Sequence, residues 1–122
     1  MTYKSTREKS KAHEKVIEDY LGIVRTPNSG ATAFRKGDLE DELSLFECKT
    51  KMNETKSFSI KKEELDKIRQ EAIARSKSFQ FYIFNYGNIT ENYVVMELRD
   101  FELLYEAYKE LFNEYKQNVG AE

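Results

Sequence analysis

The sequence predicts a single mixed α/β domain in which helices flank a central sheet. Segments with apolar residues at three- and four-residue spacing, typical of helices, alternate along the chain with short segments rich in aromatic and β-branched residues, typical of strands. Apolar residues make up 39% of the 122 residues and include 8 Tyr and 8 Phe, which is enough to build a core. No internal repeat or Pro/Gly-rich linker divides the chain. We therefore expect one domain over residues 1–122, with its core at about residues 8–98.

The first half of the chain predicts one helix and a set of short strands. Residues 5–20 carry apolar side chains at helical spacing, and Gly22 follows them as a stop signal. An acidic turn near Asp41 is expected to join two of the strands into a hairpin. The strands are expected at residues 23–26, 37–40 and 43–50. The last of these is apolar on both faces until Glu47, as in a strand buried in the middle of a sheet.

The second half predicts an extended segment, a helix, a hairpin and a final helix. Residues 57–60 are extended by composition, and residues 61–76 have one apolar helical face. Residues 79–86 and 93–98 are rich in aromatic and β-branched residues and are separated by a turn signal, so they are expected to form a hairpin.

The final helix is expected to begin with Asp100 as its cap and to run to about residue 117. Its apolar stripe consists of Phe101, Leu104, Tyr105, Tyr108, Leu111, Phe112 and Tyr115. The stripe is wide enough for this helix either to cover the sheet or to pair with a second subunit.

Composition excludes several classes of protein. The net charge of -2 and the many aromatic residues argue against a disordered chain. No apolar run is long enough to span a membrane, and the first 15 residues lack the apolar stretch of a secretory signal. A single cysteine, Cys48, cannot form an internal disulfide or a Cys-based zinc site. We expect a cytoplasmic protein without membrane association.

Charge is distributed unevenly along the chain. Residues 1–15 carry a net +3, residues 22–37 a net +3 and residues 49–62 a net +4, whereas residues 97–122 carry a net -4. A polyanion would therefore meet the first half of the molecule and avoid the last quarter. The alternative is that these segments are only solvated faces.

The candidate chemistry lies at the end of the apolar strand. Side chains two apart on a strand share a face, so Glu47 and Lys49 lie together while Cys48 points away from them. A hairpin turn near Asp41 places Asp38 across from Glu47. Two carboxylates brought together repel each other unless a cation lies between them, and their hard oxygen donors suit Mg²⁺ or Mn²⁺. The alternative is a structural Glu47–Lys49 ion pair with Asp38 as a turn residue.

The motif made by these residues resembles the D…(D/E)-x-K signature of the PD-(D/E)XK nuclease superfamily. It is carried by the letters GD at positions 37–38 and FECK at positions 46–49. The position before the aspartate, a proline in the superfamily name, is Gly37 here. An acidic first helix, an arginine and an SG loop precede this motif, in an order similar to archaeal and phage Holliday junction resolvases. The resemblance covers about residues 8–86 and implies a restriction-endonuclease-like central sheet.

The resemblance also implies roles for the site residues. Asp38 and Glu47 would bind Mg²⁺ together with the backbone carbonyl of Cys48, and Mn²⁺ would substitute for it. Glu14 would complete the metal site from the first helix, although Glu8 and Glu18 compete for that role. Lys49 would position the attacking water. The side chains implied to hold the DNA backbone are Arg25, Ser29, Arg35, Lys36, Lys51, Lys61 and Lys62.

The function implied is a Mg²⁺-dependent endodeoxyribonuclease that resolves four-way junctions in DNA recombination and repair. Branched DNA would be the partner, the enzyme would be a homodimer, and no organic cofactor would be needed. The resemblance also implies a bacterial, archaeal or phage-infected host cell. One alternative is a nuclease of the same fold that acts on single strands or flaps, and another is a catalytically silent module that binds nucleic acid or protein. Cys48 is expected to be a small core residue and His13 a surface residue or a satisfied one, neither of them catalytic.

Overall fold

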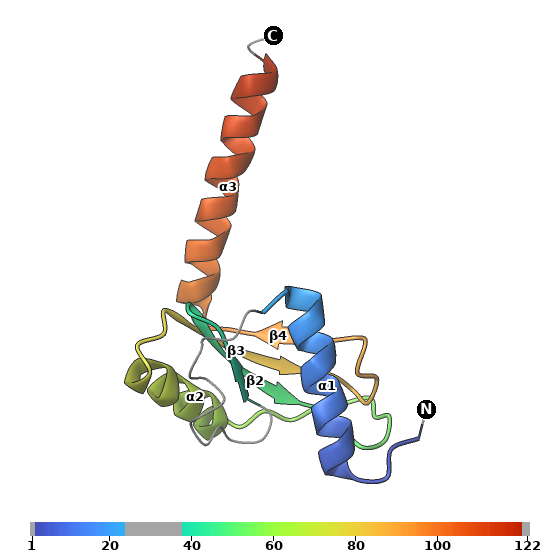
Figure 1. Cartoon of the computed structure of the whole chain (residues 1–122). Helices are drawn as coiled ribbons and strands as arrows, with labels where there is room; N and C mark the ends of the chain where they lie inside the picture. The colour runs from blue at the N-terminus through green and yellow to red at the C-terminus, as the bar shows by residue number, and fades with distance from the viewer. Residues whose placement is uncertain (1, 24–37, 121–122) are drawn as a thin grey trace.

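The structure is a computed structural model that describes residues 2–23 and 38–120. The predicted mixed α/β class is confirmed: a four-stranded mixed sheet is accompanied by three helices (Figure 1). In chain order the elements are α1 (Thr6–Leu21), β1 (Asp38–Glu40), β2 (Ser44–Lys49), α2 (Lys62–Ala74), β3 (Phe79–Phe84), β4 (Tyr93–Val95) and α3 (Leu98–Gly120).

The sheet has the strand order β1-β2-β3-β4. Strands β1 and β2 form an antiparallel hairpin, as do β3 and β4, and both hairpins were expected from the turn signals between them. Strands β2 and β3 are parallel, so the chain needs a crossover connection between them, and α2 provides it. Residues 57–60 form no strand of this sheet. Residues 24–26 of the strand predicted at 23–26 lie outside the described residues.

Most helix ends lie close to their predicted positions. Ser5 caps α1, where its side chain accepts a hydrogen bond from the backbone N–H of Glu8, and Gly22 ends this helix in the left-handed conformation at φ 64°. The start of the last helix was predicted wrongly. Helix α3 begins at Leu98 because the backbone N–H groups of Asp100 and Phe101 already donate to the carbonyl oxygen of Glu97, so Asp100 lies inside the first turn.

The core lies on both faces of the sheet. On one face Ile17 of α1 packs with sheet residues that include Phe46 and Cys48. On the other face Leu45 packs against Ile68 and Ala72 of α2. Because neighbouring side chains of a strand point to opposite faces, Glu47 and Lys49 of β2 lie on the α2 face with Leu45, and Cys48 lies on the α1 face.

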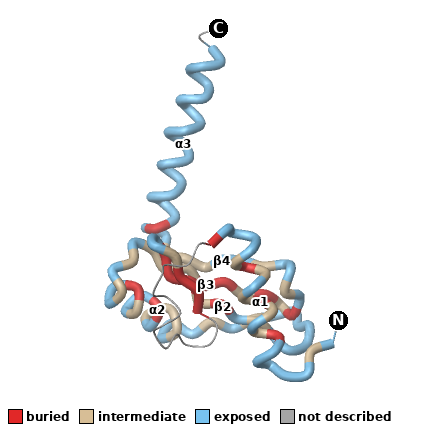
Figure 2. Tube along the Cα trace, in the orientation of Figure 1, coloured by how far each residue is buried: buried red, intermediate tan, exposed pale blue. Residues whose placement is uncertain are grey.

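Helix α3 projects away from the rest of the fold (Figure 1). Figure 2 shows it exposed along its length except near its start, where Asp100 is its one buried residue. Of the two roles that its apolar stripe allowed, covering the sheet is therefore wrong. None of the helices within residues 2–23 and 38–120 has the length and apolarity that crossing a membrane requires.

Candidate active site

The β1–β2 hairpin pairs the two acidic residues predicted for the site. Asp38 and Glu47 are directly paired in the antiparallel register, and paired residues of such strands project to the same face. Asp38 is buried and Glu47 is half-buried. The turn that sets this register is held by Asp41, whose Oδ1 accepts hydrogen bonds from the backbone N–H groups of Leu43 at 3.0 Å and Ser44 at 2.8 Å.

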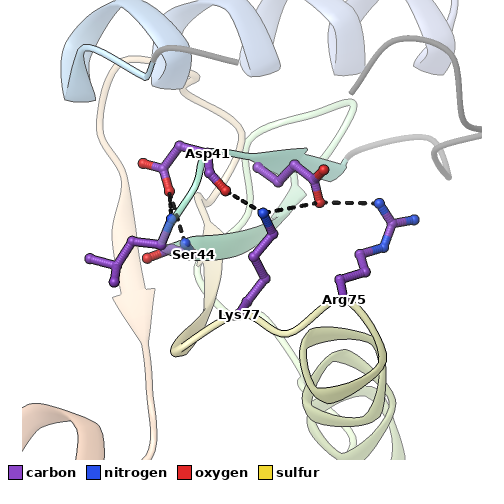
Figure 3. Close-up of polar contacts among 6 residues, drawn as sticks. Asp41, Ser44, Arg75 and Lys77 are labelled. Atoms are coloured by element: carbon purple, nitrogen blue, oxygen red, sulfur yellow. Dashed lines mark hydrogen bonds and ion pairs between the residues drawn. The ribbon is translucent and has the colours of Figure 1, made fainter. Parts of the chain in front are cut away.

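Two residues that follow the C-terminal end of α2 contact the same hairpin (Figure 3). Lys77 Nζ donates a hydrogen bond to the backbone carbonyl of Asp41 at 2.6 Å, and Arg75 Nη1 donates to Glu40 Oε2 at 3.1 Å. Lys77 Nζ also lies 4.0 Å from the same Glu40 oxygen. These contacts fix the β1–β2 hairpin relative to α2. Helix α2 is therefore the fixed neighbour of the sheet face to which Asp38 and Glu47 belong.

Lys49 joins the carboxylate pair as the sequence predicts. Its Nζ lies 3.3 Å from Glu47 Oε1, and its side chain remains 45% exposed, so the amine is open to solvent and to a ligand. The order of Glu47 and Lys49 along one strand sets this contact, because residues two apart share a face. The structure thus places an acid pair and an amine together on the α2 face of the sheet.

Glu47 and Lys49 line a cleft of about 200 Å³ between β2, β3 and α2. Sequence reasoning missed most of its walls, which also include Glu64, Lys67, Glu71 and Tyr82. Burial and the nearby charges of Glu64 and Glu47 raise the pKa of the Tyr82 phenol, so Tyr82 is neutral at ordinary pH. The sequence does carry a pattern that could have identified the α2 residues of this cleft. Positions 64, 67 and 71 lie on the same side of the helix as Ile68.

Glu14 approaches the site strand from the other face of the sheet, where its charge acts on Cys48. Glu14 belongs to α1, which packs against the face that carries Cys48, whereas Glu47 projects from the opposite face. Within residues 2–23 and 38–120, no three His, Cys, Asp or Glu side chains form a group that could hold a metal ion. Asp38, Glu47 and Lys49 belong to one face of the sheet, and α1, the helix that carries Glu14, covers the other.

Cys48 is the buried, free thiol on the back of the site strand. Its pKa is raised by burial and further by the negative charges of Glu14, Glu47 and Asp38. Nucleophilic cysteines need the opposite environment, which favours the thiolate. The structure therefore agrees with a core role for this side chain.

The predicted DNA-binding residues divide into two groups. Arg25, Ser29, Arg35 and Lys36 lie outside the described residues. Lys51, Lys61 and Lys62 are exposed. Lys51 Nζ lies 5.0 Å from the centre of the Phe58 ring, and Lys62 Nζ lies 2.9 Å from Asp66 Oδ2 in an exposed ion pair. Such surface contacts are weak, so both amines can exchange them for a phosphate.

Comparisons with known protein families, with curated proteins and with solved structures found no match. The functional interpretation of this chain therefore depends on the geometry of its own residues.

Proposed function

We propose that this protein is a metal-dependent DNA endonuclease of the PD-(D/E)XK type, which hydrolyses phosphodiester bonds. The observation that supports the proposal best is the pairing of Asp38 with Glu47 on neighbouring strands, with the Lys49 amine 3.3 Å from the Glu47 carboxylate. These are the three residue types of the D…E-x-K motif, and they lie on one face of the sheet.

The residues present fit a magnesium site in which the protein supplies only a few of the ligands. Mg²⁺ keeps several water ligands and is usually held by one or two carboxylates together with substrate phosphate. Asp38 and Glu47 would hold the ion, with the backbone carbonyl of Cys48 as a further oxygen donor. When bound, the ion would stabilise negative charge on the phosphate oxygens and favour hydroxide over water.

The chain's own residues would perform the remaining tasks. Lys49 would orient the attacking water through its exposed amine, which already lies beside a carboxylate. Lys67, on the wall of the same cleft, would add positive charge close to the scissile phosphate. Lys51, Lys61 and Lys62 would contact flanking phosphates and fix the position of the DNA without reading its sequence.

A four-way junction is the substrate we propose, with flaps and single-stranded DNA as the alternatives within the same chemistry. The order of acidic helix, arginine, SG loop and D…E-x-K motif supports the junction. A silent binding module is the less favoured possibility, because such a module has no need for Asp38, Glu47 and Lys49 to lie together.

The test is cleavage of end-labelled four-way junction, flap, single-stranded and linear duplex DNA with millimolar Mg²⁺. The junction should be cut fastest, and Glu47→Gln should lower the rate by roughly 100-fold or more, as loss of a positioned charge does. Glu42→Gln is the matched control, because Glu42 is an exposed carboxylate in the same hairpin. It should cleave at the wild-type rate.

Two results would contradict the proposal. If the wild-type protein binds these DNAs but cuts none of them with Mg²⁺ or Mn²⁺, the silent module is favoured. If Glu47→Gln cuts as fast as the wild type, the proposed site is not the site of cleavage.

A further inference from the structure

Helix α3 carries a long apolar surface that no other part of residues 2–23 and 38–120 covers. The five residues at the centre of this surface are each between 41% and 66% exposed: Phe101, Leu104, Tyr108, Leu111 and Tyr115. Tyr105 and Phe112 widen it along one side and are about half exposed. A monomeric protein rarely leaves so large an apolar surface in water, which marks it as an interface.

The spacing of these residues indicates another helix as the partner. Phe101, Tyr108 and Tyr115 recur every seven residues, and Leu104 and Leu111 each follow one of them by three residues. This is the heptad pattern by which two helices interlock along a seam. The pattern covers two such repeats, from residue 101 to residue 115, and lies wholly within the 23 residues of α3.

The surface is also large enough for a stable complex. An aromatic side chain can bury about 150–250 Å², so the half-exposed aromatic and leucine side chains of α3 together offer roughly 800 Å². A standard protein–protein interface buries about that much on each partner.

We propose that α3 pairs with α3 of a second copy of this chain, in antiparallel orientation about a two-fold axis. In this orientation each Tyr108 faces Leu111 of the second copy, and each Leu104 faces Tyr115, so a large ring always meets a smaller side chain. A parallel pair would instead set Tyr108 against Tyr108 and Tyr115 against Tyr115. Alternation of large and small side chains is the better packing.

The apolar surface continues from α3 into the body of the molecule. A cleft of about 300 Å³ lies at the base of the helix, and its walls include Tyr20, Phe81, Val94, Met96 and Leu104. Leu104 belongs to both the cleft and the seam. Because α3 is about 35 Å long, full overlap brings the last turn of the second copy's α3, with the half-exposed Val119, close to this cleft.

The first test is the mass of the protein in solution, measured by sedimentation equilibrium without metal or DNA. We expect a dimer at a protein concentration of about 100 µM, since an interface of this size commonly gives micromolar or tighter affinity. Leu111→Glu should weaken dimerisation by roughly 100-fold or more. The matched control is Asn113→Glu, on the opposite side of α3, which should remain dimeric. A wild-type monomer at this concentration, or a Leu111→Glu variant that dimerises as tightly as the wild type, would overturn the proposal.

The second test determines the orientation by intermolecular disulfide formation. In an antiparallel pair Phe101 faces Asn118 of the second copy, so a chain that carries both Phe101→Cys and Asn118→Cys should crosslink on mild oxidation, and Asn118→Cys alone should not. If Asn118→Cys alone crosslinks as readily as the double variant, the antiparallel arrangement is wrong. These measurements need no nuclease activity, so their outcome is separate from that of the proposed function.

Discussion

His13 is the chain's one histidine, and the structure gives it a place inside the fold. It is 1% exposed, and its Nε2 lies 2.7 Å from Asn92 Oδ1 in a hydrogen bond between α1 and the β3–β4 connection. Burial lowers the pKa of His13, and the nearby charge of Lys9 acts in the same direction. The imidazole is therefore neutral in the folded protein, as a satisfied core residue should be.

This lowered pKa predicts a loss of stability in mild acid. Below pH 6.5 the unfolded chain protonates His13 while the folded protein resists it, so the free energy of unfolding should fall as the pH falls. The slope from one such group is at most about 1.4 kcal/mol per pH unit. Urea unfolding between pH 5 and 8 should show a shallower acid slope in His13→Gln than in the wild type. Equal slopes would contradict a buried neutral His13.

For single residues, the sequence predicted which face of the sheet each side chain of β2 occupies, because strand periodicity determines that. The sharing of a face by Glu47 and Lys49, and the burial of Cys48 behind them, follow from alternation along one strand. Tyr82 and Glu71 were missed because their place beside Glu47 depends on how α2 packs across the sheet, which local spacing does not specify.

Among the elements, the connection between β2 and α2 makes close backbone contact with the connection between β3 and β4. Thr55 N donates a hydrogen bond to the carbonyl oxygen of Tyr86 at 2.8 Å. The next residue, Gly87, has φ 115°, and a Cβ added to it would lie 2.6 Å from the Cα of Glu54. Lys9 Nζ also donates to the carbonyl of Gly87, at 2.7 Å, which ties α1 to the same place.

Gly87→Ala should therefore destabilise the protein strongly. The added methyl group meets backbone that cannot move without breaking these contacts, so we expect a loss of roughly 2 kcal/mol or more. Gly22→Ala is the matched control, since Gly22 also has positive φ but has open space around its Cβ position. It should cost about 1 kcal/mol, for backbone conformation alone. Equal losses in chemical denaturation would show that the close approach at Gly87 does not matter.

Element types were more predictable than element ends. The apolar face of α2 and the hairpin signals of β1–β2 and β3–β4 lie in short stretches of sequence, and each became the expected element. The start of α3 was misplaced because Asp100 is a good capping residue, while the Glu97 carbonyl accepts the first helical hydrogen bonds instead. Backbone hydrogen bonding overrode the capping preference here.

For the molecule as a whole, the sheet decides which acids can act together. It sets Asp38 and Glu47 on the α2 face, and α1 with Glu14 on the other. The sequence predicted the first pairing from the length of one hairpin, which is local. The position of Glu14 depends on which face α1 covers, and nothing in the helical spacing of α1 selects a face. The apolar stripe of α3 likewise predicted that this helix packs against another surface, but it did not specify which surface.

The most direct test of the account is whether Asp38 and Glu47 bind a divalent cation, and thermal melting with and without millimolar Mn²⁺ measures it. The wild type should melt about 5 °C higher with Mn²⁺, because the ion binds only the folded protein. Asp38→Asn should abolish this shift while its metal-free melting temperature stays equal to that of the wild type or rises, and Glu42→Gln should keep the full shift. An undiminished shift in Asp38→Asn, or a large metal-free loss of stability in that variant, would contradict the proposed metal site.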